Sequence, residues 1–327
     1  MPFLPLDAPA RAGAFQLVAT LGPASMPLVE RLAEAGATAF RLNASHLGLA
    51  ELSGALAQVR DACPDAPVVV DLQGAKMRVD LREPRKVTAG QVIRLCMATD
   101  GDVRVPHAEL FAQARVGDRL SVDDGRVRFD VVHAAPGELE ARALNDGLLL
   151  PRKGLTLEQH PIHLVGLTAR DAGASAVARR HGASALAFSF MLDGTEGAWL
   201  RDAAPGCRVV GKVERREALE HLDEIADRVD ALWMCRGDLG AQLQPAALAR
   251  SVAALDPARF RVPVLMAGQV LEHLTEHPEP TRSEVCHLFD LAARGFAGIV
   301  LSDETAIGHD PVHAVATAAA LLASFRS

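Results

Sequence analysis

Eight short apolar runs recur along the chain, and most are separated by a segment in which apolar residues return every three or four positions. The runs lie at residues 15–21, 37–42, 68–72, 184–190, 208–213, 229–235, 262–267 and 297–301. Leu28, Leu32 and Ala35 ahead of Gly36 illustrate the helical spacing. Continuous apolar strands that alternate with helices are typical of a parallel sheet covered on both faces. Eight such units predict an α/β fold of the closed (β/α)8 or TIM barrel type, with an open doubly wound sheet as the alternative.

The regular alternation breaks between Asp80 and Lys153. Helical periodicity is lost there, and short β-like pieces appear at residues 87–95, 119–122 and 127–132. Asp123-Asp124-Gly125 separates the last two pieces, which is typical of a hairpin turn. We therefore expect a small, barrel-like β domain at residues 79–153, inserted after the third strand, with the barrel formed by 1–78 and 154–327. The Ala-rich segment from Val315 onward is predicted to be helical.

Composition narrows the class of protein. Hydrophobic residues make up 49% and charged residues 23% of the 327 residues, as in ordinary globular proteins. The net charge of -7 gives no general attraction to nucleic acid or to acidic membranes, so neither is expected as a partner. The five cysteines include no Cys-x-x-Cys pair, which favours reduced thiols over disulfides or a zinc site. No targeting segment or membrane-spanning run is evident, so we expect a cytoplasmic protein.

Polar side chains stand where the predicted barrel strands end, which is where barrel enzymes place their active sites. Lys212 and Glu214 are two residues apart, so a strand directs both side chains to the same side. Glu214 and Asp238 offer hard oxygen ligands without an imidazole or thiolate at ligand spacing, which favours Mg²⁺ or Mn²⁺ over Zn²⁺. A solvated ion pair is the alternative for Lys212 and Glu214. The complete set of strand-end residues is Arg41, Asn43, Asp71, Ser189, Lys212, Glu214, Asp238, Gln269 and Glu304.

Arg41 and Asn43 share a strand face in the same way. Arg41 either grips a phosphate through its guanidinium fork or forms a salt bridge at the barrel rim. Gly237 and Gly240 flank Asp238 and allow close backbone approach, and the amides that open the next helix can receive a carboxylate.

A long series of ordered motifs runs from about residue 15 to 326. The motifs are Thr20-Leu21-Gly22-Pro23-Ala24-Ser25, Arg41-Leu42-Asn43-Ala44-Ser45-His46, Asp71-Leu72-Gln73-Gly74, Val122-Asp123-Asp124-Gly125, Lys153-Gly154, Lys212-Val213-Glu214, Arg236-Gly237-Asp238-Leu239-Gly240, Pro280-Thr281-Arg282-Ser283-Glu284 and Leu301-Ser302-Asp303-Glu304-Thr305-Ala306. In these motifs and in their order the chain resembles the pyruvate kinase family. The resemblance implies a TIM barrel with a β lid and, by family analogy, a homodimer through the barrel.

The resemblance also implies a reaction, phosphoryl transfer between phosphoenolpyruvate or pyruvate and ADP or ATP. Lys212 would neutralise the phosphoryl group during transfer and stabilise the pyruvate enolate. Glu214 and Asp238 would hold Mg²⁺. The catalytic residues would thus be Lys212 and Arg41, and Arg41 would hold the transferred phosphate.

The remaining residues receive binding roles from the resemblance. The amides of Gly237 and Asp238 would contact the substrate carboxylate, and Gly268 would lie beside the substrate. The residues implied to face the nucleotide are Asn43, His46, Arg78 and Lys153.

Two departures from the family pattern bear on function. Asn43, Ser45, Asp71 and the Leu72 carbonyl match the family's potassium site, but Lys76 stands where potassium-dependent members have glutamate. We therefore predict that the Lys76 ammonium replaces K⁺.

The second departure is Gly268, in Ala267-Gly268-Gln269-Val270. The family has Ala-Thr-Gln-Met there, and the hydroxyl of its threonine helps proton delivery to the enolate. Loss of one proton relay lowers a rate by about 10²-fold or more, unless water takes its place. Because the chain stops after the eighth helix, we also expect the family's C-terminal regulatory domain, and allosteric activation of the usual kind, to be absent.

Three hypotheses follow. The first is a minimal pyruvate kinase that uses phosphoenolpyruvate, ADP and Mg²⁺. The second keeps the enolate chemistry in a lyase, an aldolase or a kinase for a different 2-oxo acid, because Gly268 opens space beside the enolate carbon. The third is a non-catalytic binder or regulator, which would have to retain buried charges at a free-energy cost without a ligand.

Overall fold

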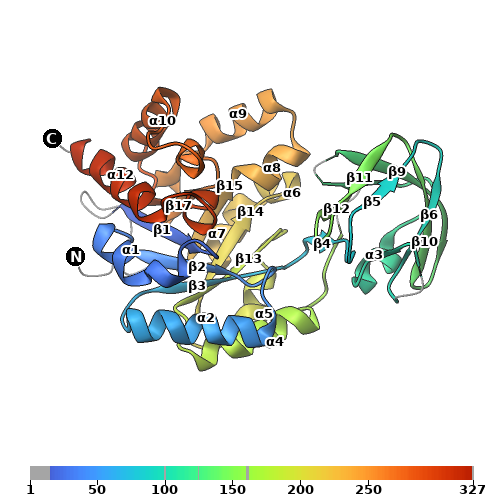
Figure 1. Cartoon of the computed structure of the whole chain (residues 1–327), viewed down its shortest axis with the longest axis horizontal. Helices are drawn as coiled ribbons and strands as arrows, with labels where there is room; N and C mark the ends of the chain where they lie inside the picture. Colours follow the sequence, from blue (N-terminus) through green and yellow to red (C-terminus); the bar gives the residue numbers. More distant parts are fainter. Residues whose placement is uncertain (1–14, 99–100, 124, 160–161, 326–327) are drawn as a thin grey trace. The chain divides into compact units, whose positions relative to one another are not determined.

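The computed structural model describes residues 15–98, 101–123, 125–159 and 162–325. The chain forms two compact units. The barrel unit comprises the described residues of Met1–Gly74 and Gly166–Ser327, and the inserted unit those of Ala75–Val165 (Figure 1). The inserted unit begins before, and ends after, the domain predicted at 79–153.

Within the described residues, eight parallel strands close into a barrel in the order β1, β17, β16, β15, β14, β13, β3, β2. Each overlaps one of the predicted apolar runs, which confirms the strands. Gln16 of the first strand pairs with Gly298 of the last, so the sheet is closed and the open doubly wound alternative is wrong. The strands are β1 (Gln16–Leu21), β2 (Ala39–Asn43), β3 (Val68–Leu72), β13 (Ala185–Phe188), β14 (Arg208–Val213), β15 (Ala231–Cys235), β16 (Val264–Ala267) and β17 (Gly298–Leu301).

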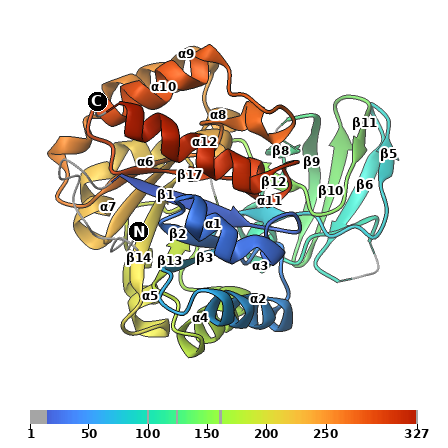
Figure 2. The ribbon, with the colours of Figure 1, turned by 60° about the vertical axis from the view of Figure 1, so that its left-hand side comes forward.

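Helices cover the outside of the barrel (Figures 1 and 2). They are α1 (Val29–Ala35), α2 (Leu49–Ala62), α4 (Ala169–Arg180), α5 (Glu196–Ala203), α6 (Arg216–Glu220), α7 (Leu222–Arg228), α8 (Arg236–Gln242), α9 (Pro245–Ala254), α10 (Arg282–Ala293), α11 (Asp303–Ala306) and α12 (Pro311–Ser324), with 3₁₀ turns η1 (Met26–Leu28), η2 (Pro257–Arg259) and η3 (Glu272–Thr275). The Ala-rich segment is helical, as predicted. None of the described helices is both long and apolar enough to cross a bilayer.

The barrel strands are buried on both sides, which explains their continuous apolar sequence. One buried cluster contains Val18, Ala39, Val69, Trp233 and Leu265, which come from five different strands. The residues that alternate with them are buried as well, for example in β3, where every residue is buried. Burial of this apolar area contributes about 25 cal/mol per Å² to the stability of the barrel.

The inserted unit is built around a curled sheet of seven strands among the described residues, in the order β4, β12, β8, β9, β10, β6, β7, and a separate pair of β11 with β5. Val122 pairs with Val127, which confirms the predicted hairpin, although Asp124 of its turn lies outside the described residues. The elements are β4 (Met77–Arg78), β5 (Arg85–Val87), β6 (Val92–Cys96), β7 (Val103–Arg104), α3 (Ala108–Gln113), β8 (Arg119–Val122), β9 (Val127–Ala135), β10 (Glu138–Ala143), β11 (Gly147–Leu149) and β12 (Gly154–Leu157).

Two predictions for the inserted unit were wrong in detail. The β-like run at 87–95 is two strands, because a turn intervenes in which the Thr88 amide donates to the Gln91 side chain and Gly90 has a φ of +84°. Helix α3 was not expected. It is only six residues long and buries only Leu110 and Phe111, too few positions to establish a helical period.

Candidate active site

Arg41 is held at the end of β2 by both neighbouring strands. Its Nε and Nη2 atoms donate to Asp71 Oδ2 of β3 over 2.9 and 2.6 Å, and its Nη1 atom donates to Thr20 Oγ1 of β1 over 3.0 Å. Arg41 and Asn43 share one face of β2, as the alternating burial of the strand shows. The salt bridge that was the alternative for Arg41 is therefore present. It leaves the guanidinium fixed at the carboxyl ends of the strands.

Lys212 lies at the centre of a buried group of charges. Its Nζ atom is 2.9 Å from Asp71 Oδ2, 2.9 Å from Ser189 Oγ and 3.0 Å from Glu214 Oε1. Lys212 is 6% exposed, Asp71 1% and Glu214 2%, so the alternative of a solvated ion pair is wrong. Ser189 follows β13, which lies between β3 and β14 in the barrel, and its hydroxyl therefore bridges the two charged strands.

The charges in this group balance one another. Burial by itself would lower the pKa of Lys212, but the Asp71 and Glu214 carboxylates outweigh it and raise that pKa above its ordinary value. Burial would likewise raise the pKa of Asp71, and Lys212 and Arg41 reverse this, so that its pKa is lowered. Both groups thus keep their charges at neutral pH. Two cations and two carboxylates thus stand together, and the contacts of Asp71 with Arg41 and Lys212 and of Lys212 with Glu214 are direct.

Glu214 follows β14, and Asp238 lies in α8, which follows the adjacent strand β15. The second oxygen of Glu214 accepts the Phe190 amide at 2.8 Å, which fixes the carboxylate. Val213 of β14 pairs with Met234 of β15, and Asp238 follows in the first turn of α8. The described residues contain no group of three or more His, Cys, Asp or Glu side chains that could hold a metal ion. A pair of carboxylates nevertheless fits Mg²⁺, which binds few protein oxygens and completes its shell with water and substrate oxygens.

The loop after β2 is tied to the end of β3. Asn43 Oδ1 accepts the Ser45 amide at 3.1 Å and its hydroxyl at 2.7 Å, and the Ala44 amide donates to the Asp71 carbonyl at 2.9 Å. The Leu72 carbonyl accepts the Ser189 hydroxyl at 2.7 Å. The structure thus brings the oxygens predicted to form a monovalent-cation site to two neighbouring strand ends. His46 is exposed in the same loop.

Sequence comparison places this barrel among known proteins. The family described as pyruvate kinase, barrel domain, matches residues 13–315. The chain belongs to the pyruvate kinase family. It is 32% identical over 318 residues to a pyruvate kinase of Methylorubrum extorquens and 30% identical over 316 residues to one of Agrobacterium vitis, in each case over 92% of this chain. It spans 66% and 67% of the length of these two relatives, and 55% of a pyruvate kinase of Geobacillus stearothermophilus to which it is 28% identical.

Gly268, the residue predicted to replace a threonine, follows β16 in a backbone conformation that favours glycine. Its φ is +76°, and Gln269 follows with a φ of +55°. Arg236 holds this turn, because its Nη2 atom donates to the Gly268 carbonyl at 3.0 Å while its Nη1 atom lies 2.8 Å from His287 Nε2. A Cβ atom on Gly268 would have no neighbour within 4 Å. The missing side chain therefore leaves open space at the barrel mouth.

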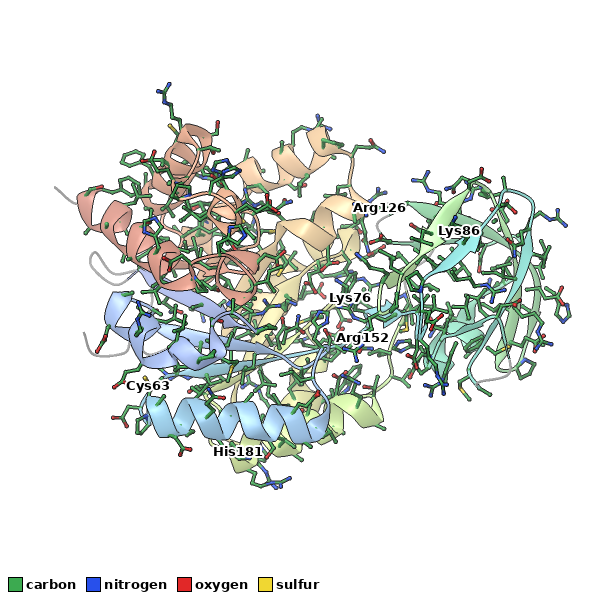
Figure 3. All side chains as sticks on the ribbon, in the orientation of Figure 1. Cys63, Lys76, Lys86, Arg126, Arg152 and His181 are labelled. Atoms are coloured by element: carbon green, nitrogen blue, oxygen red, sulfur yellow. The ribbon has the colours of Figure 1, made fainter. Side chains whose placement is uncertain are left out.

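The three remaining predicted site residues, Lys76, Arg78 and Lys153, belong to the inserted unit. Lys153 forms an ion pair with Asp123 at 2.9 Å, and Arg78 donates to the Arg152 carbonyl at 2.7 Å. Lys76 lies beside Gly154, where an added Cβ would be 3.7 Å from Lys76 Cε. Figure 3 labels Lys76 and Arg152. The nucleotide and cation roles of these residues stay predictions.

Three residues of the barrel site had no predicted role. Thr20 was part of a quoted motif, and its pairing with Arg41 in register would have indicated the contact. Ser189 was named only as a strand end. Cys235 closes β15 and is buried, and burial together with the nearby Glu214 raises the pKa of its thiol well above the ordinary value. Cys235 is therefore a neutral thiol at neutral pH, which makes it a poor nucleophile.

Proposed function

We propose that the protein moves a phosphoryl group between phosphoenolpyruvate and ADP, with Mg²⁺ as cofactor. In the forward direction the bond between the enol oxygen and phosphorus breaks, a bond from phosphorus to the terminal oxygen of ADP forms, and the enolate of pyruvate takes up a proton. The observation that supports this most directly is the buried contact of Lys212 with Asp71, Ser189 and Glu214. A desolvated ammonium at the carboxyl ends of barrel strands is suited to stabilise a developing enolate.

The other residues of the barrel site act by position and charge. Arg41 would hold the transferred phosphate, since its guanidinium is fixed by Asp71 and Thr20. The amides of Gly237 and Asp238, at the beginning of α8, would receive the substrate carboxylate. Such a site needs no covalent intermediate on the protein.

Glu214 and Asp238 would hold Mg²⁺. When bound, Mg²⁺ neutralises negative charge on the substrate oxygens. The monovalent-cation site would be formed by oxygens of Asn43, Ser45, Asp71 and Leu72. In this protein the Lys76 ammonium would take the place of the cation. Activity should then be insensitive to K⁺ in a sodium-free, tetramethylammonium-buffered assay, and a strong rise on addition of K⁺ would reject the role of Lys76.

The test of the reaction is an assay coupled to lactate dehydrogenase, with phosphoenolpyruvate, ADP and Mg²⁺. We expect pyruvate to form, and we expect Lys212→Met and Glu214→Gln to abolish its formation. Lys86→Met, which changes an exposed side chain of β5 in the inserted unit, serves as the control and should retain activity. No pyruvate at high enzyme concentration would reject the proposal.

A second candidate rests on the open space at Gly268. A substrate with an extra carbon on its enolate methylene would fit beside a residue without a side chain, so the enzyme would be a kinase for a larger 2-oxo acid. One buried methylene changes a specificity constant by about 10- to 200-fold. The same assay with the phosphoenol form of 2-oxobutyrate distinguishes the two, because this candidate requires a kcat/KM above that for phosphoenolpyruvate. A lyase or aldolase would instead exchange the methyl protons of pyruvate without any phosphoryl transfer.

A further inference from the structure

The first turn of α4 carries two oppositely charged neighbours, Arg170 and Asp171, that no part of the proposed reaction uses. The helix begins where the chain has just re-entered the barrel unit at Gly166. Thr168 caps it by accepting the Asp171 amide at 3.1 Å. Helix α4 lies beside α2 and packs on β3 in both views (Figures 1 and 2). Its first turn is therefore close to the ends of the strands that carry the site.

Asp171 holds the segment that follows β3. Its Oδ1 atom accepts the Gln73 amide at 3.0 Å, and its Oδ2 atom accepts the Gly74 amide at 3.1 Å and the Thr168 hydroxyl at 3.0 Å. The carboxylate is 1% exposed. Hydrogen bonds to a charged acceptor in such surroundings are stronger than those between neutral groups.

Gly74 is fixed from its other side as well. Its φ is +57°, and a Cβ atom on it would lie 2.0 Å from the Ser189 carbonyl oxygen. The backbone of the segment is thus packed between Asp171 and Ser189, the residue whose hydroxyl contacts Lys212. Any shift at residues 73–74 would pass directly to Asp71, two residues earlier.

Arg170 holds the loop that follows β2. Its Nη2 atom lies 3.0 Å from the Ala44 carbonyl oxygen, 3.3 Å from that of Ser45 and 2.9 Å from that of Leu47. These carbonyls belong to residues on either side of His46 in the sequence, in the loop that follows Asn43. All three contacts are made by Nη2, whose two N–H groups are shared among the three carbonyl oxygens.

The contacts of Asp171 and of Arg170 complement each other chemically. The loop after β3 presents amides and meets a carboxylate, whereas the loop after β2 presents carbonyls and meets a guanidinium. The two loops are themselves joined by the bond from the Ala44 amide to the Asp71 carbonyl, 2.9 Å long. One helical turn thus fixes two adjacent strand ends relative to each other.

We propose that Arg170 and Asp171 are positioning residues of the active site. Asp171 holds the end of β3, and with it the carboxylate of Asp71 that both Arg41 and Lys212 contact. Arg170 holds the loop of Asn43 and His46, which would face the nucleotide. The kinetic part of this inference rests on the proposed function, and the structural part does not.

The two residues should affect different kinetic constants. Asp171→Asn replaces an acceptor oxygen by an NH₂ group and should lower kcat, because Asp71 loses its fixed position. A displacement of 1 Å in a catalytic group lowers a rate by about 10²-fold, so we expect a fall of roughly 10- to 100-fold. Arg170→Met should raise the KM for ADP by about 10-fold, with a smaller change in the KM for phosphoenolpyruvate, since it removes charge-assisted hydrogen bonds from one loop. Arg170→Lys should recover part of this loss.

The controls are matched in residue type. Arg180→Met lies in the last turn of α4, and Asp202→Asn lies in α5, and both side chains are exposed. Both variants should retain wild-type constants. Because Asp171 is buried and its variant can fail to fold, the exposed Arg170 carries the test independently.

Hydrogen–deuterium exchange of the full chain tests the structural part without any substrate. Asp171→Asn should increase exchange in the peptide that contains residues 73–74, and Arg170→Met in the peptide that contains residues 44–48, with no change in the two controls. If these changes occur while the wild-type protein transfers no phosphate, the proposed function fails and the positioning of the strand ends stands. Unchanged exchange in both variants, or wild-type kinetics in both beside an active enzyme, would overturn the inference.

Discussion

Replacement of Lys212 by methionine should destabilise the barrel because it leaves two buried carboxylates without their shared cation. Asp71 and Glu214 are 1% and 2% exposed, and each is about 3 Å from the ammonium. Removing one partner of a buried ion pair costs about 3–5 kcal/mol. Asp71 keeps its contact with Arg41, so the larger part of the loss should arise at Glu214.

The destabilisation should depend on pH, and its sign follows from the direction of the pKa shifts. In the wild type the pKa of Asp71 is lowered, because Lys212 and Arg41 outweigh burial, so its contribution to stability is present above its unfolded pKa and is lost only as pH falls below about 4. Without the ammonium, burial of the carboxylates should raise their pKa values. Their protonation then relieves the unpaired charge, and the deficit of the variant should shrink as the pH is lowered from about 8 to about 5.5.

Denaturant unfolding followed by tryptophan fluorescence measures this effect, since Trp199 and Trp233 both lie in the barrel unit. The control is Lys86→Met, an exposed site where substitution should change stability by no more than about 0.5 kcal/mol. A Lys212→Met variant that unfolds within that margin of the control at high pH, or one whose deficit is the same at low pH, would refute the reasoning.

Three other outcomes are expected. Gly268→Ala should lower the free energy of unfolding by about 1 kcal/mol, since only its positive φ is unfavourable for alanine. Gly74→Ala should lower it by roughly 2–4 kcal/mol, because the Ser189 carbonyl must also move. Equal losses of stability in thermal unfolding would contradict this. Burial raises the pKa of Asp171 from 3.8 to about 6, so the stability that this group contributes is lost as the pH rises through 6. The stability of Asp171→Asn relative to wild type should therefore increase by roughly 2.5 kcal/mol between about pH 4 and 7, and a pH-independent difference would exclude that titration. Glu214→Gln should weaken Mn²⁺ binding, measured by electron paramagnetic resonance, at least about 10-fold, and unchanged binding would remove Glu214 from the metal site.

The barrel could be predicted from the sequence because its strands are buried on both faces. Every residue of β3 is apolar except Asp71, and such runs bounded by helical segments leave few alternatives. The inserted unit was harder to predict. Strands β4 and β7 are two residues long, too short to show a period, and Arg78 of β4 pairs with Gly154 of β12, far along the chain.

The candidate site was predictable as a set of residues and not as a set of contacts. A period of two placed Lys212 and Glu214 on one side of a strand, and the structure has them 3.0 Å apart. Asp71 was predicted as a strand end and as part of a monovalent-cation site, but not as a partner of Lys212. Its contact with Lys212 spans two steps of the barrel, from β3 past β13 to β14, and local spacing carries no information about that distance. Arg170 and Asp171 escaped notice because charged residues at the start of a helix are ordinary.

The most direct test of the central claim is the exchange of the methyl protons of pyruvate with D₂O, followed by nuclear magnetic resonance in the presence of Mg²⁺ and ATP. If Lys212 stabilises an enolate in a pocket with Glu214 and Asp238, the wild-type protein should exchange these protons, and both removal of Mg²⁺ and the Lys212→Met substitution should abolish the exchange. Absence of exchange in the wild type, or undiminished exchange in Lys212→Met, would contradict the account.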